Sequence, residues 1–431
     1  MLPEQIAAPV TDSSGASAAG GAAVLDVDRP LAVHELTYLP DGDEVTVGRA
    51  AVDSYAILPA DGAALLQRLA AGEPPRRAGD WYHETYGEQV DMAEFVSTLD
   101  ELGFLRSAGD AAEDGAVTGP VRFQRLGRAL FSPPAWAGYA ALAGWCAVAM
   151  ARSPELAPRY HNLFFTRYLT LVELLVFFGQ FPLLLLHEGF HALAGRRLGL
   201  RSRLGLGRRL YYLVFETALD GLVTVPRRQR YLPMLAGMLA DLLAFSALTV
   251  TADVTRLPDG RLSTAGGICL ALAFGTVLRF CWQFYFYLQT DIYHVICVVL
   301  GCVDLQATAR GMLRNRVNRL RRRPDRCIDE SRWHPRDVRV ARWYSWLLPA
   351  GYAFSLGVLA FAAAPAAYRF LSGVFGRFGD PGAGRGELTD TAVFLALNLA
   401  QGAVIAALVI RDRRRRRVAA VPRPAGAQAS S

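Results

Sequence analysis

The chain has 431 residues, of which 52% are hydrophobic and 20% are charged, and its mean hydropathy is +0.21. A soluble domain carries roughly 25% charged residues, and several apolar runs here reach the ~20 residues that span a bilayer. These values exclude an ordinary soluble protein and indicate an integral membrane protein. Five of the six cysteines lie in or beside apolar segments and none forms a Cys-x-x-Cys pair, which excludes a disulfide-stabilised secreted scaffold.

The charge divides the chain into an acidic part and a basic part. Residues 1–118 carry 21 Asp and Glu against 6 Arg, a net charge of −15, whereas residues 119–431 carry 40 Arg against 18 acids, a net charge of +22. We therefore expect an acidic soluble head attached to a basic membrane body. A head this negative argues against nucleic acid as a partner.

Residues 1–29 are rich in Ala, Gly and Ser and lack a basic start followed by an apolar core. They are predicted to be a disordered tail, and neither a signal peptide nor an anchor. Residues 30–118 have the pattern of a small α+β domain, which we name the head. It opens with two strand-like runs, Ala32–Tyr38 and Glu44–Gly48, on either side of a Pro-Asp-Gly-Asp turn, and this predicts a β-hairpin.

Three short helices are predicted to follow the hairpin. They cover residues 61–71, 75–85 and 92–102. The second opens with a proline, and Asp91 is the expected N-cap of the third. This order of elements is typical of a winged-helix-like domain.

The head contains the runs Tyr55–Leu58, Asp61–Gly62, Val90–Asp91 and Glu101–Leu105. Together they resemble the PqqD-like family, the peptide-recognition domain of ribosomal-peptide maturation systems. The resemblance implies that a leader peptide adds as a strand to the sheet edge and packs on the third helix, with main-chain hydrogen bonds supplying the affinity. The alternative is a small cytosolic regulatory cap that binds no peptide.

After a linker at residues 119–133, the body is predicted to be a polytopic all-α bundle with six apolar runs long enough to cross a bilayer. The connections at residues 196–230 and 307–342 carry nine and twelve arginines, and the tail has the run Arg413–Arg417. The positive-inside rule then places the head, both basic connections and both termini in the cytoplasm, in a multi-pass protein of the cell membrane. The candidate spans are Pro134–Ala151, Tyr168–Leu186 continuing into the segment after it, Leu232–Ala252, Ala265–Leu288, Trp343–Ala367 and Thr391–Ile410.

We expect the body to comprise a membrane core at 134–303, a basic cytosolic loop at 304–342, a membrane hairpin at 343–410 and a basic tail at 411–431. Within the core, Ile292–Val303 is apolar but only 12 residues long, too short to cross a bilayer. Counting it as a span would put the most arginine-rich loop outside. It is therefore predicted to be a helix packed partway into the bundle.

The second span runs into an HExxH motif, formed by His187, Glu188 and His191, inside an apolar helix. The spacing sets the two histidines one turn apart on one face, where they can share one zinc ion. Glu188 beside them can take a proton from water that the metal acidifies. Three ionisable groups within five residues of a membrane span are costly unless something binds them, which argues against a simple polar helix end.

A hydrolytic zinc site needs a third protein ligand and keeps a fourth position open. Asp291 follows the fourth span at its cytosolic end, at the depth of the two histidines. The arrangement resembles the site-2 protease family of intramembrane zinc metalloproteases (M50-like), in particular the peptide zinc metalloprotease group. The resemblance assigns zinc binding to His187, His191 and Asp291 and catalysis to Glu188. The glycine that follows the aspartate in this family is replaced here, so His294, on the same helical face, is an alternative ligand.

Asp241 in the third span ends a run of small residues similar to one in the same family, and it is a candidate for the substrate path or an alternative ligand. Arg279 in the fourth span and Glu173 in the second are also charged within apolar runs. At ~1.5 Å per helical residue, the two lie at similar depth. We predict that Arg279 pairs with Glu173 or Asp241 in a contact that locks the bundle.

The segment Leu204–Thr217 is aromatic and strand-like. In proteins similar to this one, such a segment holds an unwound substrate beside the metal. The substrate must be extended there, because a helix hides its amide carbonyls in backbone hydrogen bonds. The runs Arg321–Arg323 and Arg413–Arg417 are interpreted as topology determinants that also attract anionic lipid headgroups.

Two functions from different classes follow from these patterns. The favoured one is a membrane endopeptidase with Zn²⁺ as its cofactor, which cleaves a precursor or membrane-tethered peptide in ribosomal-peptide maturation while the head recruits the substrate. The alternative is a non-proteolytic membrane module for export, immunity or signalling, with a vestigial metal site. Replacing Glu188 by alanine distinguishes them. A DNA-binding winged helix on a membrane sensor is disfavoured by the charge of the head.

Overall fold

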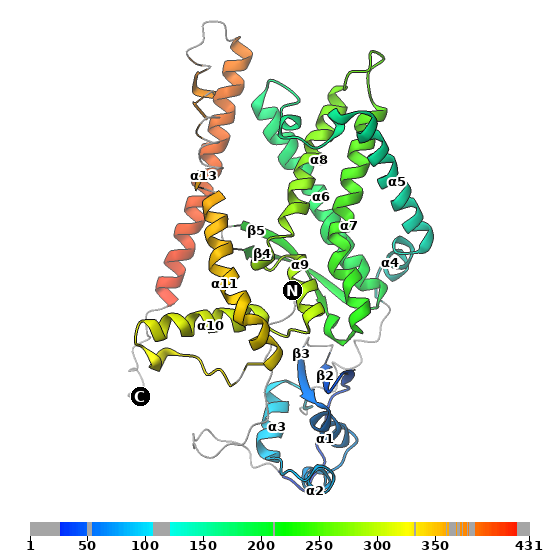
Figure 1. Cartoon of the computed structure of the whole chain (residues 1–431), viewed down its shortest axis with the longest axis vertical. Coiled ribbons are helices and arrows are strands. Elements are labelled where there is room, and N and C mark those ends of the chain that lie inside the picture. Colours follow the sequence, from blue (N-terminus) through cyan, green and yellow to red (C-terminus); the bar gives the residue numbers. More distant parts are fainter. Residues whose placement is uncertain are drawn as a thin grey trace, which may run out of the picture.

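The computed structural model describes residues 26–49, 54–106, 121–209, 212–331, 333–358 and 384–419, with a few isolated residues between 360 and 378. Most of this part of the chain is helical. A three-stranded sheet lies near the N-terminus and a two-stranded hairpin lies in the membrane body (Figure 1). The predicted disordered tail falls almost wholly outside the described residues, so it stays a prediction.

The head contains an antiparallel sheet of three strands in the order β1 (Thr37–Asp41), β2 (Glu44–Arg49) and β3 (Ser54–Pro59). Asp41 pairs with Glu44 across a two-residue turn, in which Gly42 takes a φ of +69° that glycine tolerates best. The predicted hairpin is therefore confirmed, but its first strand begins later than expected. The third strand was not predicted.

The three predicted helices of the head are present as α1 (Ala60–Ala70), α2 (Pro75–Tyr86) and α3 (Met92–Glu101). Asp91 caps α3 as expected, because its Oδ1 accepts hydrogen bonds from two backbone amides of the first turn, at 2.9 and 3.0 Å. The helices and the sheet enclose one apolar core. Its largest fully buried members are Phe104, Leu65, Leu66, Leu69, Leu99 and Val47.

The described part of the body is built mainly from helices. Between α6 and α7 the strands β4 (Arg201–Arg209) and β5 (Tyr212–Asp220) pair as an antiparallel hairpin, which confirms the strand-like character predicted there. A short 3₁₀ turn, η5 (Leu222–Thr224), follows β5. The helices are α4 (Gln124–Leu130), α5 (Pro133–Arg152), α6 (Leu169–Arg197), α7 (Arg227–Val254), α8 (Thr264–Trp282), α9 (Asp291–Leu300), α10 (Leu305–Leu320), α11 (Pro335–Val358) and α13 (Arg385–Ala419).

Three helices of the described chain, α6, α7 and α8, are long and apolar enough to cross a membrane. The bent pair formed by α9 and α10 meets the same criteria when its two helices are taken together, with an angle of 88° between them. The remaining predicted spans correspond to α5, α11 and α13, and the end of the span predicted at Trp343–Ala367 lies outside the continuously described residues. The described residues therefore contain three helices, or four spans if the bent pair counts as one, that are long and apolar enough to cross a membrane, which indicates a membrane protein.

The fourth predicted span ends earlier than expected. The helix α8 stops at Trp282 instead of Leu288. The chain then folds back, because Gln283 accepts two hydrogen bonds from the residues that open α9: its backbone oxygen from the Thr290 hydroxyl and its Oε1 from the Asp291 amide. Most of the short apolar stretch at Ile292–Val303 lies in the ten-residue helix α9, which is too short to cross a membrane by itself, as predicted.

The head contacts the body through the turn between β1 and β2. Oδ2 of Asp41 lies 2.8 Å from Nε of Arg227 at the start of α7, and Oε1 of Glu44 lies 2.8 Å from Nε2 of His334, just before α11. Both strands also touch η5. Figure 1 shows the head at the end of the body where α6 ends and α7 begins. The head therefore lies against the segment that connects β5 to α7.

Candidate metal centre

His187 and His191 lie one turn apart on α6, an apolar helix that continues to the basic residues at its C-terminus. Their side chains are buried, with exposed fractions of 4% and 9%. The two Nε2 atoms are 3.2 Å apart. The HExxH spacing therefore presents two imidazole nitrogens to one point, as the sequence predicted.

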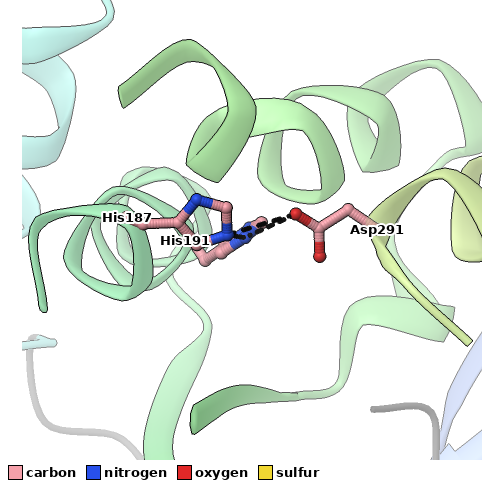
Figure 2. A group of neighbouring side chains, drawn as sticks. All are labelled: His187, His191 and Asp291. Carbon is pink, nitrogen blue, oxygen red and sulfur yellow. Dashed lines mark hydrogen bonds and ion pairs between the residues drawn. The ribbon is translucent and has the colours of Figure 1, made fainter. Parts of the chain in front are cut away.

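Asp291, the first residue of α9, brings a carboxylate to the same point (Figure 2). Its Oδ2 lies 3.3 Å from Nε2 of His187 and 3.2 Å from Nε2 of His191. In a tetrahedral zinc site with bonds of about 2.0–2.1 Å, neighbouring ligand atoms are separated by roughly 3.3 Å. The three distances match one face of such a tetrahedron, so the group can hold a metal ion.

The hydrogen bonds of the two rings fix which nitrogens face the metal position. Nδ1 of His191 lies 2.7 Å from the backbone oxygen of Pro233, and because a carbonyl only accepts, this nitrogen carries the hydrogen. Nδ1 of His187 lies 3.0 Å from Oδ2 of Asp241, a carboxylate that accepts in the same way. In the neutral form of each ring, Nε2 therefore directs a lone pair toward Asp291, and a cation between these three atoms satisfies them all.

Two further observations fit a metal at this point. Oδ2 of Asp291 is buried and has no hydrogen-bond donor among the described residues. Gly237 on α7 lies directly against the ligands, and a Cβ at this position would overlap Nε2 of both His187 and His191. The small residue thus leaves the room that the two imidazoles occupy.

Glu188, the expected catalytic residue, lies beside the first histidine and is 6% exposed. Its Oε2 accepts a hydrogen bond of 2.7 Å from the hydroxyl of Thr217 on β5. The carboxylate is therefore tied to the hairpin that packs beside α6. The sequence did not predict this contact, because a threonine in a strand carries no signal of a partner on a distant helix.

A cavity of about 280 Å³ opens onto the metal position. Its walls come from α6, β5, η5, the start of α7, the end of α8 and the segment that leads into α9. Most of the lining is apolar. The lining includes Leu184, Glu188, Val214, Phe215, Glu216, Leu219, Leu222, Met234, Arg279, Gln283 and His294.

The structure separates the two alternative ligands from the metal group. Asp241 binds the far nitrogen of His187, so in this structure it supports one of the three candidate ligands and lies outside their group. It does not line the cavity either, so its predicted place in the substrate path is also not observed. His294 lines the cavity but lies outside the metal-binding group.

The predicted pairing of Arg279 with Glu173 or Asp241 is confirmed, and its partner is Asp241. Nη2 of Arg279 lies 2.6 Å from Oδ1 of Asp241. Glu173 instead accepts hydrogen bonds from Asn398 and Gln401 on α13, at 3.0 and 2.8 Å. The position of a residue along a helix gives its depth in the membrane but not the direction in which its side chain points. The side chains of Asp241 and Glu173 point in different directions, and only that of Asp241 reaches Arg279.

Comparisons with protein-family models, with curated proteins and with solved structures find no match to this chain. The metal centre therefore rests on its own geometry.

Proposed function

We propose that this protein is a membrane-embedded zinc endopeptidase. The observation that carries the proposal is the set of three ligand atoms, from His187, His191 and Asp291, which lie 3.2 to 3.3 Å from one another with Glu188 adjacent. Two histidines and one carboxylate, with a fourth position facing a cavity, are typical of hydrolytic zinc sites. A structural zinc site would have four protein ligands, and no fourth His, Cys, Asp or Glu joins this group among the described residues.

The chemistry follows from the residues around that position. A bound zinc ion supplies a Lewis acid that polarises the scissile carbonyl and acidifies water. Glu188 takes a proton from the attacking water molecule while the oxygen of that water bonds to the carbonyl carbon. The same carboxylate then delivers that proton to the amine nitrogen as the carbon–nitrogen bond breaks. Thr217 holds the carboxylate of Glu188 through Oε2 during both transfers.

The cavity supports a peptide as the substrate. Its apolar walls suit hydrophobic side chains, and β5 forms one wall with residues Val214, Phe215, Glu216, Thr217 and Leu219. An extended peptide beside this strand exposes its carbonyl groups to the metal, whereas a helical one hides them. We propose a ribosomally made precursor or a membrane-tethered peptide as the substrate class, recruited by a PqqD-like, winged-helix-like head.

We further propose six spans, with both termini in the cytoplasm of a cell-membrane protein. The exposed apolar faces of the helices support this placement: on α6, Phe177 and Phe178 are each 65% exposed, and Trp145 on α5 and Trp346 on α11 are more than half exposed. Side chains of this kind need lipid or a partner around them. The runs Arg321–Arg323 and Arg413–Arg417 then lie near the membrane surface, where they attract anionic lipid headgroups.

The experiment that tests the proposal does not require the substrate to be identified first. Membranes from cells that produce the wild type are compared by peptide mass spectrometry with membranes from cells that produce Glu188→Gln at equal abundance. We expect about one zinc per chain in both purified proteins, and uncut peptides that accumulate only with Glu188→Gln. Identical peptide profiles from the two strains would favour the non-proteolytic module, and a wild type without zinc would remove the metal site itself.

A further inference from the structure

Arg279 lies within the apolar helix α8 and its side chain is only 15% exposed. Its guanidinium group makes three hydrogen bonds with side chains of two other helices. Nη2 and Nε donate to Oδ1 of Asp241 on α7, at 2.6 and 3.0 Å, and Nη1 donates to Oε1 of Gln180 on α6, at 3.0 Å. Three membrane helices therefore meet at this one arginine.

Each member of this group is held in a single orientation. Nε2 of Gln180 donates to the backbone oxygen of Leu272 at 2.7 Å, which turns its Oε1 toward Arg279. The carboxylate of Asp241 is fully buried, and each of its oxygens has a different partner. Oδ1 accepts a hydrogen bond from Arg279, and Oδ2 accepts one from Nδ1 of His187. A continuous chain of hydrogen bonds thus runs from Gln180 through Arg279 and Asp241 to a metal ligand.

A role in locking the bundle accounts poorly for this arrangement. A buried ion pair is a weak source of stability, because desolvation of the two charges offsets their attraction. Hydrogen bonds to neutral side chains also join helices in this protein, without an ion pair. Glu173 on α6 accepts hydrogen bonds from Asn398 and Gln401 on α13. Ionisable groups inside a membrane span usually serve function, and this pair ends on a zinc-ligating histidine.

We infer that Asp241 is a positioning residue for the zinc ligand His187, and that Arg279 and Gln180 hold Asp241 in that position. The inference rests on the proposed zinc site. The second histidine has a counterpart to this support, because Nδ1 of His191 donates to the backbone oxygen of Pro233. For His187 the same support comes from the side chain of Asp241, which a substitution can remove. Loss of an outer partner of this kind typically lowers metal affinity by about 10- to 100-fold.

The test measures metal binding by the full chain in detergent. Zinc affinity is determined by competition with a chromophoric chelator for the wild type, Asp241→Asn and Arg279→Lys. The visible spectrum of the Co²⁺-substituted proteins reports the ligand geometry at the same time. Glu173→Gln is the matched control, because it also removes a charge from a membrane helix but bonds to α13 and not to the metal group.

We expect Asp241→Asn to lower zinc affinity by roughly 10- to 100-fold and to shift the Co²⁺ spectrum, with a smaller loss in Arg279→Lys. Glu173→Gln should match the wild type in both. If Asp241→Asn and Arg279→Lys keep the affinity and spectrum of the wild type, the positioning role is wrong even though the zinc site stands. If Asp241→Asn fails to fold, Arg279→Lys alone decides, since it keeps the positive charge and loses the two-nitrogen contact. A wild type that binds neither metal overturns the proposed function as well.

Discussion

The hydroxyl of Thr217 on β5 donates a hydrogen bond of 2.7 Å to Oε2 of Glu188 on α6. These residues lie 29 positions apart in the chain, and the contact joins the proposed general base to the strand that walls the cavity. A carboxylate that must receive and return a proton works best when its orientation is fixed. The hairpin therefore forms a wall of the cavity and also orients the carboxylate of Glu188.

Replacing Thr217 by valine removes this hydrogen bond and keeps the shape of the side chain. A hydrogen bond to a charged group contributes about 1.5–3 kcal/mol, so we expect kcat to fall by roughly 10- to 100-fold. Bound zinc should not change, because Thr217 does not touch the ligands. Thr217→Ser keeps the hydroxyl and should retain most of the activity. Equal rates for the valine and serine variants would contradict the positioning of Glu188 by Thr217.

Gly237→Ala places a methyl group against Nε2 of both histidines. Overpacking of this kind costs about 1–3 kcal/mol, so we expect zinc affinity to fall by roughly 5- to 150-fold as the rings are displaced. The control is Gly144→Ala on α5, where an added Cβ meets no described atom within 4 Å. Zinc titration of the two purified variants checks the prediction, and unchanged affinity in Gly237→Ala would place the metal elsewhere.

Asp291→Ala and His294→Ala separate the third ligand from its neighbour in the cavity. Of these two residues, only Asp291 belongs to the metal group. Its alanine variant should therefore lose more zinc affinity than a variant that removes a residue supporting a ligand. His294→Ala should keep about one zinc per chain and change only the rate of peptide cleavage. Metal analysis of both proteins after dialysis gives the answer. Retention of zinc by Asp291→Ala together with its loss from His294→Ala would reverse the assignment.

The ion pair between Asp41 and Arg227 attaches the head to the body. Both side chains are about one-third exposed, so the pair contributes no more than about 1 kcal/mol, but Asp41→Arg sets two like charges against each other. We expect faster hydrogen exchange at the amides of Leu222–Thr224, which the head touches. The exchanged pair Asp41→Arg with Arg227→Asp should restore the slow rate. If Asp41→Arg exchanges like the wild type, this contact does not hold the head.

Several features were predictable because they depend on local pattern alone. The spacing of His187 and His191 fixes one face of a helix whatever surrounds it. The cap at Asp91 and the turn at Gly42 follow from hydrogen bonds and backbone freedom within a few residues. That Asp291 lies at the depth of the two histidines was predictable, because it follows the fourth span at the same end of the bundle.

Other features were not predictable because they depend on where distant segments meet. The strand β3 pairs with β2 through backbone groups that any sequence offers. The end of α8 at Trp282 depends on hydrogen bonds that Gln283 accepts from residues beyond the turn. Thr217 likewise becomes important only once β5 lies beside α6.

The sequence by itself determined a membrane body, an acidic head and an HExxH motif, since hydropathy, charge and helical periodicity act over short stretches of chain. The tertiary structure alone decided which carboxylate faces the metal position and which supports it. Asp291 and Asp241 are both acids in or beside apolar helices at similar depth. Only the direction in which each helix presents its side chain makes Asp291 a candidate ligand and Asp241 the partner of His187.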